Sequence, residues 1–258
     1  MHSVYVPGAS PLHALHPLTK LAGAALVLAA VFALPWPAAL PALLALVLAL
    51  AAIGGVLPTL LRRLLLLLAP VICSLLLIQG LLFPPERITP LTVGPLTIWA
   101  EGLRFALTTA VRLLTLTGTM LLLVQTTHPA DLVAALTAIG APRSVGYIIL
   151  VALQLLPDMA ARANAILEAQ RSRGLETEGV LRRLRSLPAL VAPLIVGALV
   201  DVEARALALE SRAFAARGPK TTLRALRDTP GQRTARWLLL GAAGALLLLR
   251  LTLLRGAG

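Results

Sequence analysis

The feature that most constrains the fold is a series of long runs of Leu, Ala and Val that carry almost no charge. A helix that crosses the hydrocarbon of a membrane needs about 20 consecutive apolar residues. Of the 258 residues, 58% are hydrophobic and 13% are charged, whereas a soluble domain carries about 25% charged residues. We therefore expect an all-α, multi-pass membrane protein with about five transmembrane helices. The expected spans are residues 21–34 (extendable to 18), 38–56, 64–83, 103–124 and 237–254.

Residues 125–236 differ from these runs. They hold 15 of the 23 basic residues and 9 of the 11 acidic ones, and their apolar residues recur periodically. This pattern predicts a long amphipathic helix that bends near Pro157. A second long helix is expected over about residues 189–213, apolar at first and charged after Asp201. Both turn polar halfway, so we expect them at or below the membrane surface. One face of the first helix, polar except for Ala165, follows at steps of three and four: Gln154, Asp158, Arg162, Ala165 and Glu168.

The distribution of arginine predicts the orientation in the membrane. Basic residues are retained on the cytoplasmic side, and they occur at Arg62, at Arg63 and throughout 125–236. We therefore expect the amino terminus and residues 125–236 in the cytoplasm of a plasma-membrane protein without a secretory signal, and the carboxyl terminus outside. Arg250 and Arg255 lie on the wrong side for this topology. The expected domains are a membrane domain (1–124), a cytoplasmic coupling domain (125–236) and a last transmembrane helix (237–258).

The chain lacks the motifs of a membrane enzyme or motor. It contains no GxxxxGK[ST] phosphate loop, no HExxH and no pair of cysteines, so we expect neither catalysis nor a cofactor in this chain. Cys73 lies in an apolar run and is expected to be buried. Arg104 is expected to reach the interface, whereas Arg112 is deeper and is expected to pair inside a helix bundle. The histidines are interpreted as solvated rather than metal-binding: His2, His13, His16 and His128.

Two similar stretches, "QRSRG" and "ESRAF", stand out in the charged region. If the first helix runs to Arg173, Gly174 suits the left-handed residue beyond its end, and the arginine projects past the last turn. A guanidinium there can bind a carboxylate of a partner with two hydrogen bonds. Helix capping explains each stretch alone, whereas two copies favour docking. The candidate residues are Ser172, Arg173, Gly174, Ser211, Arg212 and Ala213, supported by Gln170, Arg171 and Glu210.

At this point the chain resembles the transmembrane T component of energy-coupling factor (ECF) transporters, the ABC-type importers of vitamins and trace metals. "YVPGASPLHALHPLTKL" (5–21) resembles the opening of that family, and "TTHPADLVAALTAIGAPRSVGYIILVAL" (126–153) resembles the stretch that leads into its coupling helices. "EAQRSRGLE" and "ALESRAF" resemble its paired Ala-Arg-Gly signatures. Neither is literally Ala-Arg-Gly, since Ser172 and Ser211 replace the alanine and Ala213 replaces the second glycine.

The resemblance implies a non-catalytic coupling subunit with several partners. Arg173 and Arg212 would sit in grooves of two cytoplasmic ABC ATPases, which would bind ATP and Mg²⁺. A membrane-embedded substrate-binding (S) component would rest on the helices behind them, on a platform around Leu155, Met159 and Ile166. The lipid bilayer is a further expected partner, and nucleic acid is not.

Two other functions remain open from the residues alone. A self-sufficient channel or intramembrane enzyme would use Arg104 and Arg112 to line a path, although its spans lack the acidic and histidine residues of proton and cation pathways. A membrane-tethered binder of anionic lipid or nucleic acid would rest on the net charge of +12, and its binding would depend strongly on salt.

Overall fold

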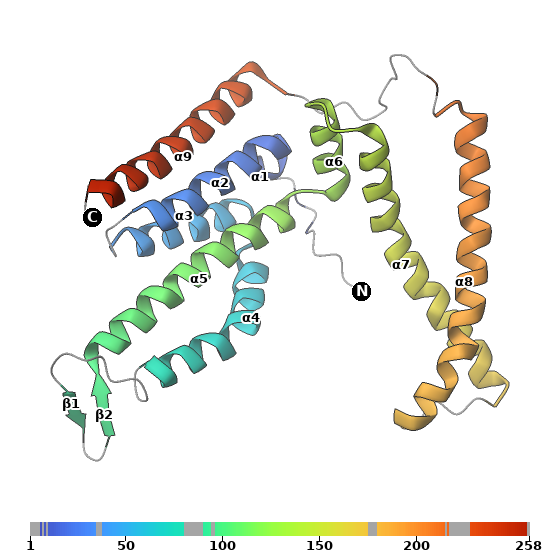
Figure 1. The fold of residues 1–258 in the computed structure, drawn as a ribbon, viewed down its shortest axis with the longest axis horizontal. Coiled ribbons are helices and arrows are strands. Elements are labelled where there is room, and N and C mark those ends of the chain that lie inside the picture. Colours follow the sequence, from blue (N-terminus) through green and yellow to red (C-terminus); the bar gives the residue numbers. More distant parts are fainter. Residues whose placement is uncertain are drawn as a thin grey trace. The chain divides into compact units, whose positions relative to one another are not determined.

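The computed structural model describes residues 6, 8, 10–34, 38–79, 90–93, 96–174, 180–214, 216 and 228–256 (Figure 1). The chain forms two compact units, one of residues 141–225 and one that joins residues 2–140 to 226–258. We call the second the membrane unit and the first the helix-pair unit. The elements of the membrane unit are α1 (Pro11–Ala14), α2 (Pro17–Ala33), α3 (Ala39–Ile53), α4 (Leu57–Leu77), β1 (Pro90–Val93), β2 (Leu96–Trp99), α5 (Ala100–Thr126), α6 (Pro129–Ala138) and α9 (Pro230–Gly256).

The all-α class with helices long enough for a multi-pass membrane protein is confirmed. By length and composition, the described residues contain five helices able to cross a membrane: 57–77, 101–126, 144–172, 187–211 and 230–252. Between α4 and α5, the strands β1 and β2 pair as an antiparallel hairpin. The first two expected spans form the shorter apolar helices α2 and α3, of 17 and 15 residues. At 1.5 Å per residue they are only about 25 and 22 Å long.

The third expected span begins earlier than the apolar run suggested. Helix α4 starts at Leu57, with a proline in its first turn, and it includes Arg62 and Arg63. A proline at the first helical positions costs no hydrogen bond, since its N–H has no partner there. Positions 80–83 of the expected span lie outside the described residues.

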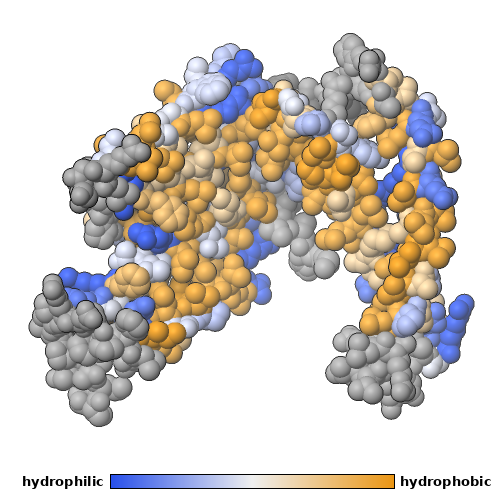
Figure 2. All heavy atoms as spheres, viewed as in Figure 1, coloured by the Kyte–Doolittle hydropathy of each residue, from blue (hydrophilic) through white to orange (hydrophobic). Residues whose placement is uncertain are grey.

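The core of the membrane unit lies between α2, α3, α4 and α5. One face of α4 packs into this core, because residues four apart share a helix face. That face carries Leu60, Leu64 and Leu68. The prediction that Cys73 is buried was wrong: it is exposed, since its position on α4 does not fall on that buried stripe. Figure 2 shows hydrophobic side chains over much of the visible surface of the helices, as expected where a chain contacts lipid rather than water.

The helix-pair unit consists of α7 (Arg143–Ser172) and α8 (Val180–Ser211). Pro157 lies inside α7, and two further prolines lie inside α8, which begins nine residues before the expected 189. The two helices are antiparallel (Figure 1): Tyr147 near the start of α7 contacts Phe214 just beyond the end of α8, and Arg162 within α7 contacts Asp201 within α8. The unit covers residues 141–225.

Candidate functional site

The first arginine-tipped helix ends as its sequence predicted. Helix α7 stops at Ser172, Arg173 follows with φ −91°, and Gly174 adopts φ +86°. The N–H of Gly174 donates to the carbonyl of Arg171 at 2.9 Å, which is one of the bonds of a glycine-terminated helix end. A side chain at Gly174 would meet nothing within 4 Å, so glycine is favoured there by its backbone conformation alone.

The second helix ends in the same way with alanine in place of glycine. Ala213 adopts φ +53°, the one positive φ outside glycine among the described residues. Its N–H donates to the carbonyl of Glu210 at 2.9 Å, and the N–H of Phe214 donates to the carbonyl of Leu209 at 3.0 Å. These two bonds form a Schellman motif. The departure from glycine therefore leaves the left-handed end of α8 intact.

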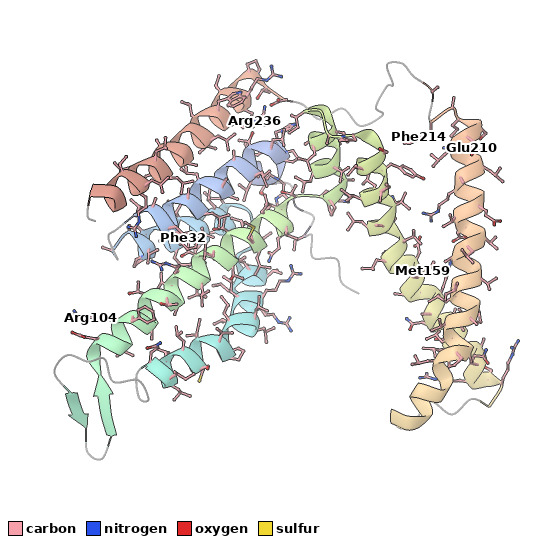
Figure 3. All side chains as sticks on the ribbon, viewed as in Figure 1. Phe32, Arg104, Met159, Glu210, Phe214 and Arg236 are labelled. Atoms are coloured by element: carbon pink, nitrogen blue, oxygen red, sulfur yellow. The ribbon has the colours of Figure 1, made fainter. Side chains whose placement is uncertain are left out.

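Phe214 compensates for the cost of the left-handed alanine. Its ring packs on Tyr147 near the start of α7, with centroids 5.2 Å apart. Aromatic pairs of this kind contribute about 0.5–1.5 kcal/mol, which is comparable to the cost of roughly 1–2 kcal/mol for a left-handed side chain. Figure 3 shows Phe214 directed at α7, next to Glu210 at the end of α8.

Both tips present the same groups. Ser172 donates its hydroxyl to the carbonyl of Glu168, and Ser211 donates to that of Ala208, each at 3.1 Å. The serines thus bond to their own helices, and the side chains of Arg173 and Arg212 are exposed. Because α7 and α8 are antiparallel, their carboxyl ends lie at opposite ends of the pair. The helix-pair unit therefore offers two separate, similarly built cationic tips.

The expected platform residues Leu155, Met159 and Ile166 are half-buried in the helix-pair unit. Met159 is marked on α7 in Figure 3. More apolar surface lies on other positions of the same two helices, where large side chains are exposed in the described structure: Val145, Ile148, Leu153 and Leu156 on α7, and Val191, Ile195, Val196, Leu199 and Leu207 on α8.

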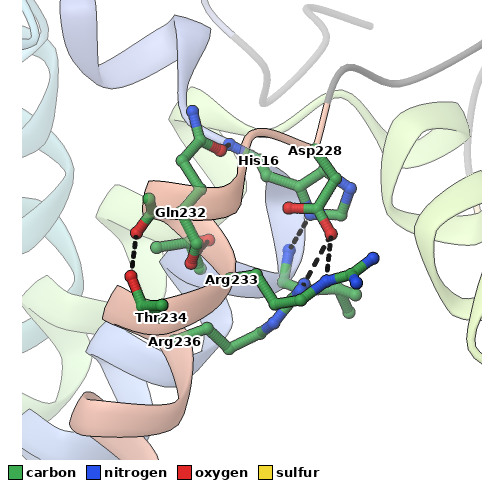
Figure 4. A network of polar contacts seen from close by, with 9 residues as sticks. His16, Asp228, Gln232, Arg233, Thr234 and Arg236 are labelled. Carbon is green, nitrogen blue, oxygen red and sulfur yellow. Dashed lines mark hydrogen bonds and ion pairs between the residues drawn. The ribbon is translucent and has the colours of Figure 1, made fainter.

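A polar cluster joins the start of α2 to the start of α9 (Figure 4). The backbone N–H of His16 donates to Oε1 of Gln232 at 2.9 Å, and Nη2 of Arg236 donates to Oδ2 of Asp228 at 2.9 Å. Burial lowers the pKa of His16 from its ordinary 6.5. The hydrogen bond from Arg236 is the largest cause that lowers the pKa of Asp228. The cluster fixes α9 alongside α2.

The amino-terminal motif closes the same end of the membrane unit. Nδ1 of His13 bonds to Oγ of Ser10 at 2.7 Å, and its Nε2 donates to the carbonyl of Val6 at 3.0 Å. Nζ of Lys20 donates to the carbonyl of Thr126 at 2.7 Å, where a cation suits the carboxyl end of α5. A Cβ on Gly8 would lie 2.9 Å from Cε1 of His13. Hydrogen bonding and close packing thus account for Gly8, Ser10, His13 and Lys20 in this motif.

The interpretation of the histidines as solvated was wrong for those described. His16 is buried and His13 is hydrogen-bonded, as given above. His128 is the N-cap of α6, since its Nδ1 accepts from the N–H of Ala130 at 3.2 Å. His2 lies outside the described residues. Over the described part of the chain, no three His, Cys, Asp or Glu side chains gather where they could hold a metal ion.

Arg112 lies inside α5 and is half-buried. Its guanidinium carbon lies 6.0 Å from the centre of the Phe32 ring of α2, a cation–π contact between two helices of the bundle. Its Nε is buried and has no hydrogen-bond partner among the described residues. Arg104 is exposed in the second turn of the same helix (Figure 3). Arg112 therefore has a partner within the bundle, as expected, and this partner is the Phe32 ring. Hydropathy along α5 alone could not indicate that partner.

Comparison with known proteins places this geometry in a family. Residues 8–223 match the family CbiQ, described as cobalt transport protein. The chain is 31% identical over 239 residues to the energy-coupling factor transporter transmembrane protein EcfT of Thermanaerovibrio acidaminovorans, covering 86% of each chain. It is 30% identical over 240 residues to EcfT of Heliobacterium modesticaldum, again covering 86% of each. It is also 28% identical over 234 residues to a putative ABC transporter ATP-binding protein of Bifidobacterium longum, covering 85% of this chain and 29% of that protein.

Proposed function

Because the chain belongs to the CbiQ family and is an EcfT-type transmembrane coupling component of ECF transporters, we propose that Arg173 and Arg212 dock two ABC ATPase subunits. It is a multi-pass membrane protein and not an enzyme. ATP and Mg²⁺ would be bound by the ATPases, so that hydrolysis there drives the helix pair, and the helix pair moves an S component for uptake of a vitamin or trace metal.

One observation carries this proposal: two helices of one unit end in the same left-handed cap, each with an exposed arginine next to it. A cap at a helix end needs no arginine, whereas a rigid end with a guanidinium suits a carboxylate in a groove. The matching protein of Bifidobacterium longum adds support. It carries a region similar to this chain within a longer protein described as ATP-binding, so the two functions occur in one polypeptide there.

The apolar surface of the helix pair supports the second half of the proposal. In the most apolar windows of α7 and α8, only 6% and 0% of the residues are fully buried, so much apolar surface of these helices is left for a partner. A membrane-embedded S component would cover it by burial of apolar area, which requires no fixed polar pairing and tolerates movement. Leu155, Met159 and Ile166 remain the proposed centre of this platform, within a coupling domain of residues 125–236 that faces the cytoplasm.

The test is co-purification of the ATPases with the full-length protein. Loss of a buried, hydrogen-bonded charge pair costs about 2–5 kcal/mol, so the double variant Arg173→Glu/Arg212→Glu should release the ATPases while the protein still inserts. Arg205→Glu is the control for the α8 tip, because it makes the same charge change as Arg212→Glu at a position on α8 away from the tip. Full ATPase retention by the double variant would refute docking through the arginines.

The other functions left open by the residues find no support in this family. A self-sufficient channel or an intramembrane enzyme conflicts with membership among non-catalytic transporter components. A binder of anionic lipid or nucleic acid rests on net charge alone, and no contact in the described structure favours it.

A further inference from the structure

The middle of the helix pair contains an ion pair between its two helices. Nη2 of Arg162 on α7 lies 2.6 Å from Oδ2 of Asp201 on α8. A Cβ added to Gly197, one turn before Asp201, would lie 3.6 Å from Nη1 of Arg162. The guanidinium therefore lies across the surface of α8, where a glycine leaves room for it, and reaches the carboxylate one turn further on.

This ion pair lies at the same distance from both arginine tips. Arg162 precedes Arg173 by eleven residues, and Asp201 precedes Arg212 by eleven residues. Eleven residues make about three turns of helix, or about 16 Å. Each charged residue of the pair therefore lies on the same face of its helix as the arginine at the tip. Further residues also recur at equivalent positions on the two helices: Ala165 and Ala204, Ala169 and Ala208, Ser172 and Ser211.

Two residues at the same distance from their helix tips are equivalent positions, and a contact between them marks a two-fold axis that relates the helices. In a symmetric pair of antiparallel helices, a residue at the axis contacts its own equivalent. Arg162 and Asp201 are such equivalents, and they do meet. Two identical charges would repel there, whereas arginine opposite aspartate makes the contact favourable. The last three turns of α7 and α8 are thus related by an approximate two-fold axis that passes through this ion pair.

We propose that Arg162 and Asp201 are positioning residues that hold the Arg173 and Arg212 tips in a two-fold arrangement, matched to two ATPase grooves that are themselves related by a two-fold axis. The inference rests on the proposed function only for what the tips bind. The ion pair sets how far apart the tips lie and how they are turned relative to each other. Without it, each tip keeps its cap but loses its fixed relation to the other.

The experiment measures the separation of the helices directly, in the full-length protein with Cys73→Ser. Spin labels at Glu168→Cys and Leu207→Cys occupy equivalent, exposed positions. Each label lies between the ion pair and the arginine tip of its helix. We expect one narrow distance distribution for the parent. Arg162→Asp or Asp201→Arg should each replace it with a broad one and lower the amount of ATPase that co-purifies. The swap Arg162→Asp/Asp201→Arg should restore both.

Controls separate positioning from folding. Glu203→Arg has an exposed position and changes the charge as Asp201→Arg does, so it should behave as the parent. Arg162→Met/Asp201→Leu keeps an apolar contact without charge and should still broaden the distribution. The inference is overturned if Arg162→Asp, Asp201→Arg or Arg162→Met/Asp201→Leu keeps the narrow distance distribution. It is also overturned if the swap variant is monodisperse but has a broad distance distribution. Failure of docking alone would appear differently: Arg173→Glu/Arg212→Glu would retain the ATPases, while the distances would still report on the ion pair.

Discussion

Replacement of Ala213 by glycine should stabilise the end of α8. Ala213 has φ +53°, a conformation that places the Cβ of an L-residue close to the following carbonyl. Glycine has no Cβ and adopts it freely. The hydrogen bonds of this cap are made by backbone groups of Ala213 and Phe214, so the substitution removes no hydrogen bond.

The size of the effect follows from two opposing contributions. A side chain in the left-handed region costs roughly 1–2 kcal/mol, and glycine adds roughly 0.4–1 kcal/mol of unfolded-chain entropy. The net stabilisation is about 0.5–1 kcal/mol, which is about a 2- to 5-fold change in the opening equilibrium at 1.4 kcal/mol per factor of ten. Because the cap opens locally, this change should be confined to the last turn of α8 and the residues that follow it.

Hydrogen exchange of the Ala213 and Phe214 amides measures this opening. Both should exchange about 2- to 5-fold more slowly in the Ala213→Gly variant. Ala208→Gly is the matched control: it makes the same chemical change inside the helix, where glycine costs about 0.8–1 kcal/mol, so exchange should become faster. The reasoning fails if both variants change the exchange rates in the same direction.

Three further outcomes follow from other contacts. Gly174→Ala should destabilise the end of α7 by about 1–2 kcal/mol through backbone strain alone, seen as faster exchange of the Gly174 amide, with ATPase co-purification as a second readout. Lys20→Met should lower the thermal midpoint in detergent, because the carbonyl of Thr126 loses a charged donor worth about 1.5–3 kcal/mol, whereas Lys20→Arg should retain most of it. Since burial lowers the pKa of His16, its contribution to stability is complete above pH 6.5 and declines as pH falls below that value; Asp228, whose pKa is also lowered, stays ionised there. His16→Asn, which keeps a cap acceptor, should therefore flatten the dependence of the thermal midpoint on pH between 5 and 7, and an unchanged slope would contradict the assignment.

The tips show how far local sequence can be interpreted. The end of α7 was predictable because Gly174 is itself the signal for a left-handed cap. The end of α8 was not, because alanine gives no such signal and the conformation depends on the contact of Phe214 with Tyr147 on the other helix. Two similar left-handed helix ends therefore arise from one local and one tertiary cause.

The amino-terminal motif was recognisable as a pattern but not as a structure. His16 bonds to Gln232, a residue 216 positions away, and Lys20 bonds to Thr126, 106 positions away. Nothing in the periodicity around His16 indicates such partners, so a solvated loop was the reasonable expectation. The same limit explains Cys73, since the buried face of α4 is defined by α3 and α5 rather than by its own composition.

The helix pair shows a limit of hydropathy. It identifies a membrane protein securely, but it identifies less securely which helices cross the membrane. The mean hydropathy of the best windows of α7 and α8 is 1.6 and 1.8, similar to 1.7 for α5. Charged residues near the middle of α7 and α8 nevertheless suggested helices that turn polar towards water. In the structure, Arg162 and Asp201 neutralise each other across the pair, so these charges do not by themselves require water around either helix. A charged residue on one helix does not require water if an opposite charge on another helix pairs with it. The periodicity of either helix alone does not reveal that partner. The polarity of α7 and α8 therefore does not by itself determine the side of the membrane on which the Arg173 and Arg212 tips lie.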